Sequence, residues 1–191
     1  MSERSLENKE PRSIMVLVVA HCVLNRTTRW WQKGQDVERN MGPVCEILRF
    51  LSKNKIGVFQ LPCPEYMFLG NPRPPATKDD YKNLQGFKEH CEQLAVDSAK
   101  HLRLLVKKGR EPKTVLLAIV GIERSPCCGV SCTPRKFDGE TKYKNEKGLF
   151  FEALFEELKK LGCTIPMIGL DMHQPDDVCR KLAVLLKSRV E

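Results

Sequence analysis

Short apolar runs alternate along the chain with longer amphipathic stretches. The apolar runs are rich in β-branched residues and carry few polar positions, a pattern typical of strands buried on both faces of a sheet. These predicted strands lie at 14–20, 57–61, 114–120 and 164–168. The amphipathic stretches carry apolar residues at helical spacing. The helices that they predict lie at 41–54, 77–108, 149–162 and 175–190.

This strand–helix alternation predicts an α/β fold, a Rossmann-like parallel sheet of about four strands with helices on both faces. Residues 62–76 hold five of the 12 prolines, which predicts a stiff loop that is neither a regular helix nor a central strand. Residues 121–148 read as a loop region with a polar, hairpin-like piece around 137–139, and Gly86 is a candidate bend in the long helix. Ligands of parallel sheets bind outside the carboxyl ends of the strands, so a site is expected in the loops that follow them.

The length of 191 residues suits one domain over 13–191, preceded by a flexible polar tail at 1–12. The apolar runs are far shorter than the roughly 20 residues that a membrane-spanning helix needs. The first residues carry charges of both signs and no apolar signal core. We therefore expect a cytoplasmic protein with no membrane contact, and the sequence leaves its oligomeric state open.

The chain carries 32 Lys and Arg against 24 Asp and Glu, a net charge of +8. Such a surplus favours anionic partners such as nucleotides or RNA. The basic residues are spread along the chain with no long basic run, which is also the pattern of an ordinary solvated surface. Nucleic acid stays an open partner that no motif indicates.

Nine cysteines stand out in a chain of this composition. In a reducing compartment they point to metal or catalytic use rather than to disulfides. Three of the predicted strands are closely followed by cysteine, namely by Cys22, Cys63 and the pair Cys127–Cys128. Three loops can therefore bring thiols to one edge of the sheet. Three thiolates suit zinc or an iron–sulfur cluster, and three protein ligands leave one position open. A lone cysteine is usually a small buried apolar residue, and we expect such structural roles for Cys45, Cys91, Cys163 and Cys179.

Two polar groups lie in the same loops. Glu65 comes two residues after Cys63, and Ser125 comes three residues before Cys128. A carboxylate beside a metal site can move protons, and a hydroxyl can relay one or bind an anion. The alternatives are a loop salt bridge from Glu65 to Arg73 and a turn role for Ser125.

Three motifs in order carry a resemblance to a known family. They are AHCVLN at 20–25, PCPE at 62–65 followed by LGNPRPPA at 69–76, and RSPCCG at 124–129. With them the chain resembles the thiouracil desulfurase (desulfidase) family over about residues 14–170. The sequence departs from the family pattern at three places. These are His21 before the first motif cysteine, Cys127 inside the third motif and Trp30–Trp31 in the first loop. They indicate a related branch and leave the substrate open.

The resemblance implies a 4Fe–4S cluster held by Cys22, Cys63 and Cys128, with one open iron site. It places the family's acid/base glutamate and serine on Glu65 and Ser125. The implied substrate is a small molecule, a thiolated pyrimidine nucleobase, its nucleoside or a similar thiocarbonyl compound. Its sulfur would leave as hydrosulfide without net redox change.

Five further residues are candidates for the site, and each also has an ordinary structural interpretation. His21 is a candidate donor to cluster sulfur, Trp30 and Trp31 for stacking on a base, and Arg73 for binding an anion or carbonyl. His173 follows the fourth predicted strand at the same sheet edge. Ordinary core, loop or surface roles stand beside each of these.

Two other functions stay open. A sulfur transferase or thio-modification protein acting on a nucleotide or tRNA would consume sulfide rather than release it. A non-catalytic module that binds a metal or a cluster would not need Glu65 or Ser125. The chain has no GxxxxGK[ST] motif and no GxGxxG after a strand, which counts against ATP-driven activation by this chain alone.

Overall fold

The computed structural model describes residues 13–109 and 112–189. The tail expected at 1–12 lies outside the described residues, so the division into a tail and one domain stays a prediction. Among the described residues, no helix has the length and apolar character needed to cross a membrane.

Four parallel strands form the central sheet, in the order β2-β1-β3-β6. Their bounds are β1 Ile14–Val19, β2 Gly57–Gln60, β3 Thr114–Ile122 and β6 Met167–Leu170. The two central strands, β1 and β3, are the most deeply buried, as their unbroken Val, Ile and Leu content predicts. The last strand begins three residues later than predicted, directly after Pro166, which has no N–H to give to a ladder.

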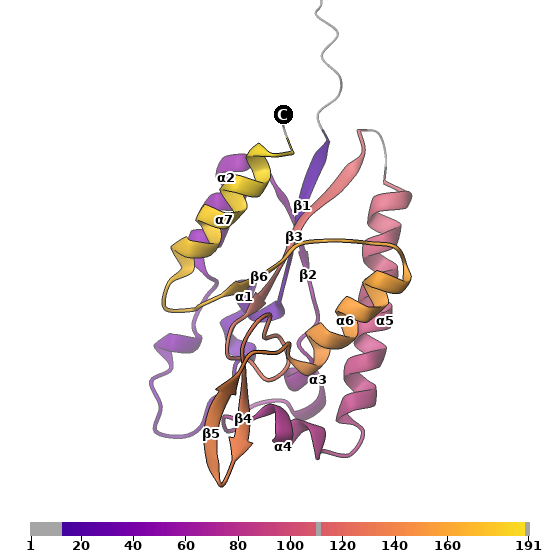
Figure 1. The fold of residues 1–191 in the computed structure, drawn as a ribbon. Coiled ribbons are helices and arrows are strands. Elements are labelled where there is room, and N and C mark those ends of the chain that lie inside the picture. Colours follow the sequence, from indigo (N-terminus) through magenta and orange to yellow (C-terminus); the bar gives the residue numbers. More distant parts are fainter. Residues whose placement is uncertain (1–12, 110–111, 190–191) are drawn as a thin grey trace, which may run out of the picture.

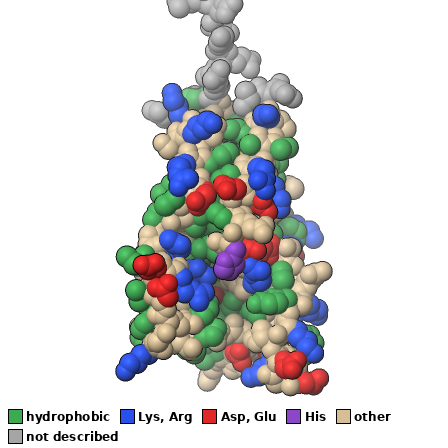
Figure 2. All heavy atoms as spheres, turned by 90° about the vertical axis from the view of Figure 1, so that its left-hand side faces the viewer, with side chains coloured by type: hydrophobic (Ala, Val, Ile, Leu, Met, Phe, Trp, Pro, Cys, Tyr) green, Lys and Arg blue, Asp and Glu red, His purple; other side chains and the backbone are tan. Residues whose placement is uncertain are grey.

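Helices cover both faces of this sheet. Helices α2 (Cys45–Asn54) and α7 (Pro175–Lys187) pack together on one face, and α5 (Phe87–Lys107) and α6 (Leu149–Lys160) pack together on the other (Figure 1). The predicted Rossmann-like α/β fold is thereby confirmed. Figure 2 shows the side that carries α2 and α7, where Lys and Arg are scattered and mixed with acidic and apolar side chains.

The proline-rich segment contains a helix, so the prediction of a purely irregular loop at 62–76 was wrong. Helix α3 (Pro64–Leu69) begins with Pro64 in its first turn. The first N–H groups of a helix have no intrahelical partner, and proline is tolerated there for that reason. Cys63 is the N-cap residue of this helix, which fixes the position of its backbone.

The helix predicted over 77–108 is two helices. Helix α4 (Lys78–Lys82) begins at a capping box in which the Thr77 side chain and Asp80 bond to each other's backbone. The chain then turns through Gly86, whose φ of 79° is a left-handed conformation that glycine adopts without strain, before α5 begins. The predicted bend at Gly86 is confirmed.

The polar hairpin-like piece is a two-stranded antiparallel ribbon, β4 (Thr133–Phe137) and β5 (Glu140–Lys144). Asp138 and Gly139 form its turn with positive φ at both positions, as the commonest hairpin turn requires. Three further short helical turns, α1 (His21–Leu24), η1 (Arg26–Thr28) and η2 (Glu38–Asn40), lie in the long connection after β1.

The strand order determines where a ligand crevice opens. From β1 the chain moves to β2 on one side, and from β2 it crosses to β3 on the other side of β1. The loops after β1 and β3 therefore diverge at this switch point, which is where open parallel sheets bind ligands.

Candidate active site

The three motif cysteines all lie at the carboxyl edge of the sheet. Cys22 lies in α1 directly after β1, Cys63 caps α3 directly after β2, and Cys128 lies in the tight turn that follows β3. The Cys128 carbonyl accepts from the Ile122 N–H at 2.8 Å, which folds this turn back onto the end of β3.

The three thiols affect one another electrostatically. Burial raises the pKa of the Cys22 thiol to about 12, and the nearby charge of Cys63 adds to this rise. Burial likewise raises the pKa of Cys128 well above its usual value, with Cys22 and Cys63 both contributing. The pKa of Cys63 is raised by burial and by Glu65. All three are therefore neutral thiols near pH 7 unless a bound cation stabilises the thiolates.

The neighbouring Cys127 has different surroundings. Its thiol is fully buried and lies against Cys91 of α5, and burial together with that contact raises its pKa well above the usual value. Cys22 and Cys63 influence Cys128 but are not among the groups that shift Cys127. Of the adjacent pair, Cys128 is thus the thiol whose pKa responds more strongly to the other two motif cysteines.

Ser125 builds the turn that carries this pair. Its Oγ accepts from the Cys127 N–H at 3.3 Å and from the Cys128 N–H at 3.0 Å. A Cβ at Gly121 would overlap the Cys128 carbonyl oxygen, and a Cβ at Gly148 would overlap the Cys127 backbone. The two glycines therefore allow the turn to lie directly against β3 and the start of α6.

Glu65 is a buried carboxylate with two fixed partners. It is 8% exposed, and its Oε2 accepts from Arg73 Nη2 at 3.1 Å and from the Tyr81 hydroxyl at 3.3 Å. We call Glu65, Arg73 and Tyr81 the Glu65 network. The salt bridge from Glu65 to Arg73 that the sequence suggested is present, and it is buried rather than an exposed loop contact.

Arg73 does not have the ordinary surface role that was the alternative to a site role, since only 5% of it is exposed. Its Nη2 also donates to the Thr28 carbonyl at 2.6 Å, and its Nη1 donates to the Gly70 carbonyl and to Asn71 Oδ1. The Arg73 carbonyl accepts from the Trp31 N–H at 3.0 Å. Arg73 thus joins the loop after β1 to the loop after β2.

Three arginines of the loop after β1 lie close together. Burial lowers the pKa of Arg29, and the charges of Arg39 and Arg26 lower it further, while Cys22 and Glu65 act in the opposite direction. The charges of Cys22 and Glu65 thus both act on Arg29, whose Nη1 donates to the Arg39 carbonyl at 3.4 Å. Among the described residues, none of the three arginines has a carboxylate partner in an ion pair. We call them the arginine patch.

Trp30 and Trp31 are half-buried, and each has a protein contact. The Arg39 guanidinium lies 4.4 Å from the centre of the Trp30 ring, and Trp31 Nε1 donates to the Gln35 carbonyl at 3.2 Å. One face of Trp30 is therefore covered. Stacking of either ring on a base stays a prediction.

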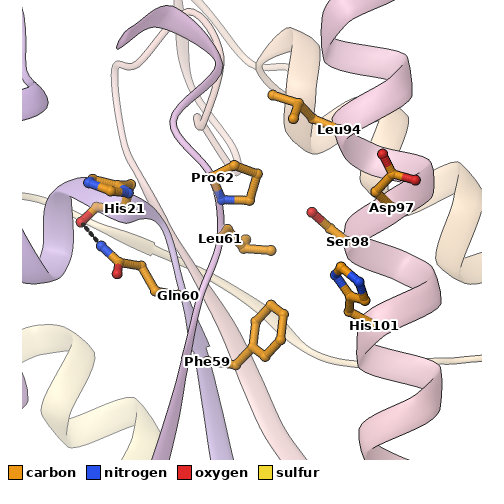
Figure 3. Close-up of a pocket in the computed structure, with 9 residues that line it drawn as sticks. All are labelled: His21, Phe59, Gln60, Leu61, Pro62, Leu94, Asp97, Ser98 and His101. Carbon is orange, nitrogen blue, oxygen red and sulfur yellow. Dashed lines mark hydrogen bonds between the residues drawn. The ribbon is translucent and has the colours of Figure 1, made fainter. Parts of the chain in front are cut away.

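His21 lies beside a hollow at the free edge of the sheet. The hollow has a volume of about 310 Å³ between β2 and α5, and it is lined by His21, Pro62, Phe59, Ser98 and His101 among others (Figure 3). Burial lowers the pKa of His21, so its imidazole is neutral near pH 7. The exposed His173 has its backbone N–H bonded to Asp171 Oδ1. Roles for the two histidines at the thiol edge stay predictions.

The donor set suits a soft, cationic group. Among the described residues, no three His, Cys, Asp or Glu side chains converge closely enough to hold one metal ion. A four-iron cluster is a larger body than a single ion and separates its ligands accordingly. Three neutral thiols that would repel one another as thiolates match a group that supplies positive charge and prefers sulfur.

Sequence reasoning missed two partners of this site. Tyr81 lies between Asp80 and Lys82, and its polar neighbours gave no sign that its hydroxyl reaches a carboxylate 16 residues away. Arg29 lies in a loop without regular periodicity, so its orientation could not be inferred. The capping box at Thr77 was the signal that fixed the start of α4, and with it the approximate place of Tyr81.

Comparisons with known proteins agree with this architecture. The profile of the family described as "Putative 2-thiouracil desulfurase" matches residues 14–168. A protein of Methanocaldococcus jannaschii, "Uncharacterized protein MJ0003", is 29% identical over 161 residues, which cover 84% of this chain and 88% of that protein. Among solved structures, the [4Fe-4S]-dependent thiouracil desulfidase TudS matches with a TM-score of 0.50 and 18% identity, covering 92% of this chain and 99% of that chain. At that identity the likeness is one of fold. The family profile spans most of the chain, and the chain belongs to the thiouracil desulfurase family.

Proposed function

We propose that this protein is an iron–sulfur-dependent desulfidase that replaces the sulfur of a small thiocarbonyl compound with oxygen from water. The observation that supports this proposal is that Cys22, Cys63 and Cys128 follow β1, β2 and β3 at the carboxyl edge of the sheet, where Glu65 is buried two residues after Cys63. The thiocarbonyl compound and water give a carbonyl compound and hydrogen sulfide, with no net oxidation or reduction.

Cys22, Cys63 and Cys128 would hold the cluster, and Cys127, which lies against Cys91, would stay a structural thiol. When bound, a 4Fe–4S cluster with one open iron supplies a soft Lewis acid for the thiocarbonyl sulfur and for the sulfide that leaves. The raised thiol pKa values predict that loading releases protons from these cysteines.

Glu65 is the candidate general base and acid. Its Oε2 is engaged by Arg73 and Tyr81, and within the described chain no hydrogen bond reaches Oε1. Oε1 can therefore accept a proton from the attacking water and return it to the leaving group. Such a proton transfer typically contributes about 100-fold to 10,000-fold in rate.

Ser125 has a hydroxyl proton available to donate. Its Oγ accepts from two backbone N–H groups, so its lone pairs are used and its own proton remains free for a partner. We propose that it donates to negative charge developing on the substrate. Its hydrogen bonds to the Cys127–Cys128 turn give it a second role in placing Cys128.

The arginine patch bears on the substrate class. Guanidinium groups that repel one another and have no described carboxylate partner would be stabilised by an anion. A phosphorylated thiopyrimidine nucleoside or a thiolated RNA carries such a group, whereas free thiouracil does not. The expected preference is a higher kcat/KM for the thiolated nucleoside monophosphate than for the free base, and Arg29→Ala should reduce that preference.

The direct test is sulfide release by protein loaded anaerobically with iron and sulfide. We expect hydrogen sulfide and uracil in equal amounts from 2-thiouracil or its nucleotide. Glu65→Gln should reduce the rate while the iron content stays that of the parent. Ser125→Ala should also reduce the rate, which is expressed per bound cluster because Ser125 also holds the turn that carries Cys128. A loaded protein that releases no sulfide from either compound would exclude this function.

The same experiment separates the two alternatives. A sulfur transferase would consume sulfide and form a thiolated product from the oxygen analogue. A binding module without catalysis would keep all of its measurable behaviour in Glu65→Gln and Ser125→Ala. Because the outcomes differ in the direction of sulfide flow and in the effect of Glu65, one set of variants decides among all three.

A further inference from the structure

We propose that Arg73 and Tyr81 are positioning residues for Glu65, which occupy Oε2 together and so leave Oε1 as the oxygen that meets water and substrate. The inference rests on the proposed function and adds the residues that determine how the carboxylate is presented. Neither residue is proposed to touch the substrate.

Arg73 holds Glu65 from one side and cannot easily move. Its Nη2 bonds both Glu65 Oε2 at 3.1 Å and the Thr28 carbonyl at 2.6 Å, and its Nη1 bonds the Gly70 carbonyl at 3.1 Å and Asn71 Oδ1 at 2.7 Å. The guanidinium plane is thus fixed by two separate loops. Rotation of the Glu65 carboxylate would break its contact with a donor that cannot follow it.

Tyr81 holds the same oxygen from the side of α4. Its hydroxyl lies 3.3 Å from Glu65 Oε2, and its ring is stacked on Phe87 with centroids 4.5 Å apart and planes inclined by 21°. Burial and the charge of Glu65 raise the pKa of Tyr81 above its ordinary value. The phenol therefore stays protonated and acts as a donor to Oε2.

The arrangement differs from that of a simple stabilising ion pair. Arginine and carboxylate in such a pair commonly bond through two parallel contacts, one to each oxygen. Here two donors from different elements share one oxygen, whose two lone pairs are then filled. The other oxygen has no hydrogen bond from the described residues, in a side chain that is 11% exposed.

The test begins with Tyr81→Phe, which removes the hydroxyl and keeps the ring that stacks on Phe87. Tyr143→Phe is the matched control, because Tyr143 is 60% exposed on the hairpin. In anaerobically loaded protein we expect Tyr81→Phe to lower kcat about tenfold, the effect of one hydrogen bond to a charged group. KM should stay within about twofold of the parent and iron per chain should be unchanged. Tyr143→Phe should match the parent in all three.

Arg73→Lys sharpens the kinetic test, since it keeps the charge and loses the planar fork. It should lower kcat at least as much as Tyr81→Phe does. An unchanged kcat in Tyr81→Phe would overturn the proposal. So would a raised KM at constant kcat, which would indicate substrate contact, or a loss of iron, which would indicate a role in the ligand loops.

A second readout needs neither cluster nor activity. Urea unfolding of the cluster-free protein is measured for Tyr81→Phe, Glu65→Ala and the double variant; if Glu65→Ala does not fold, Glu65→Met replaces it. Tyr81 and Glu65 share one hydrogen bond. The loss of unfolding free energy in the double variant should therefore be smaller than the sum of the losses in the two single variants. Additive shifts would overturn the proposal. A parent without desulfidase activity would overturn the proposed function, while this cycle would still decide whether Tyr81 holds Glu65.

Discussion

Among the described residues, two networks of charged side chains contain a buried member, and they are built differently. The Lys78 network joins α4 to the hairpin: Lys78 contacts the Lys147 carbonyl, Glu146 and Glu152, and Arg135 bonds both Asp79 and Glu146. Each cation there has several acceptors. In the Glu65 network two donors converge on one oxygen of one carboxylate, and the second oxygen is left without a described partner.

The surroundings of the two networks differ as well. Lys78 is 1% exposed, but its partners reach the surface. The largest causes of the pKa shifts of Asp79, Arg135 and Glu146 are hydrogen bonds, burial and neighbouring charges other than thiols. The carboxylate of Glu65 raises the pKa of Cys22, Cys63 and Cys128. A network with a structural role needs every charged group to have a partner, whereas proton transfer beside the proposed cluster ligands needs a carboxylate oxygen without one. The comparison assigns stability to the first network and chemistry to the second.

The largest expected effect comes from breaking the Glu65 network. Glu65→Gln should lower kcat by about 100-fold to 10,000-fold, because the amide cannot accept and return a proton. Steady-state sulfide release by the loaded protein measures this. Glu152→Gln is the control from the Lys78 network and should keep the parental kcat. Equal losses in both variants would remove the distinction between the networks.

The next effect comes from breaking the Lys78 network. Lys78→Met should lower the free energy of unfolding by about 2 kcal/mol, less than for a fully buried pair because the partner carboxylates can regain water. Urea unfolding measures this change, and Lys88→Met, on the exposed face of α5, is the control with little effect. The folded Lys78→Met protein should keep the parental kcat. A large loss of kcat without loss of stability would contradict the assignment.

The smallest effect is the acid sensitivity of the Lys78 network. Hydrogen bonds from Arg135 and from the Lys136 backbone lower the pKa of Asp79 to about 2. Because this value lies below that of an unfolded aspartate, the contribution is present above about pH 4 and is lost as the pH falls toward 2. It should amount to less than about 1 kcal/mol, since the pair is partly exposed.

Urea unfolding between pH 5 and pH 2.5 checks this, because the interval spans the pKa of an unfolded aspartate and ends just above the folded pKa of Asp79. Arg135→Ala should lose less stability over that interval than the parent does, and Arg103→Ala, at an exposed position of α5, should follow the parent. Parallel curves for parent and Arg135→Ala would show that Asp79 titrates in the folded protein as it does in the unfolded chain.

The order of elements could be predicted from the sequence because it depends on local periodicity. The β-branched runs at β1 and β3 and the helical spacing in α2, α6 and α7 needed no long-range information. The predictions were wrong where the effect of a proline or glycine depends on its place at the start or end of a helix or strand. Pro64 starts a helix rather than preventing one, Pro166 delays β6, and the capping box at Thr77 starts a helix that ends before Gly86.

Some residues of the candidate site could likewise be predicted from the sequence, and others could not. The cysteines could be proposed because each follows a strand, and parallel strands bring their carboxyl ends together. The choice of Cys128 over Cys127 came from the family pattern, and the structure shows that the two thiols have different neighbours. Tyr81 could not be predicted because its contact with Glu65 depends on how α3 and α4 each pack against α5, which no local pattern encodes.

The central claim is that Cys128, and not Cys127, completes a cluster site with Cys22 and Cys63. The most direct measurement is iron per chain after anaerobic reconstitution of the parent, Cys128→Ala and Cys127→Ala, read together with the visible absorption. We expect about four irons and a broad brown absorption in the parent and in Cys127→Ala, and the loss of both in Cys128→Ala. A colourless parent that holds a single zinc, or a loss of iron in Cys127→Ala alone, would contradict it.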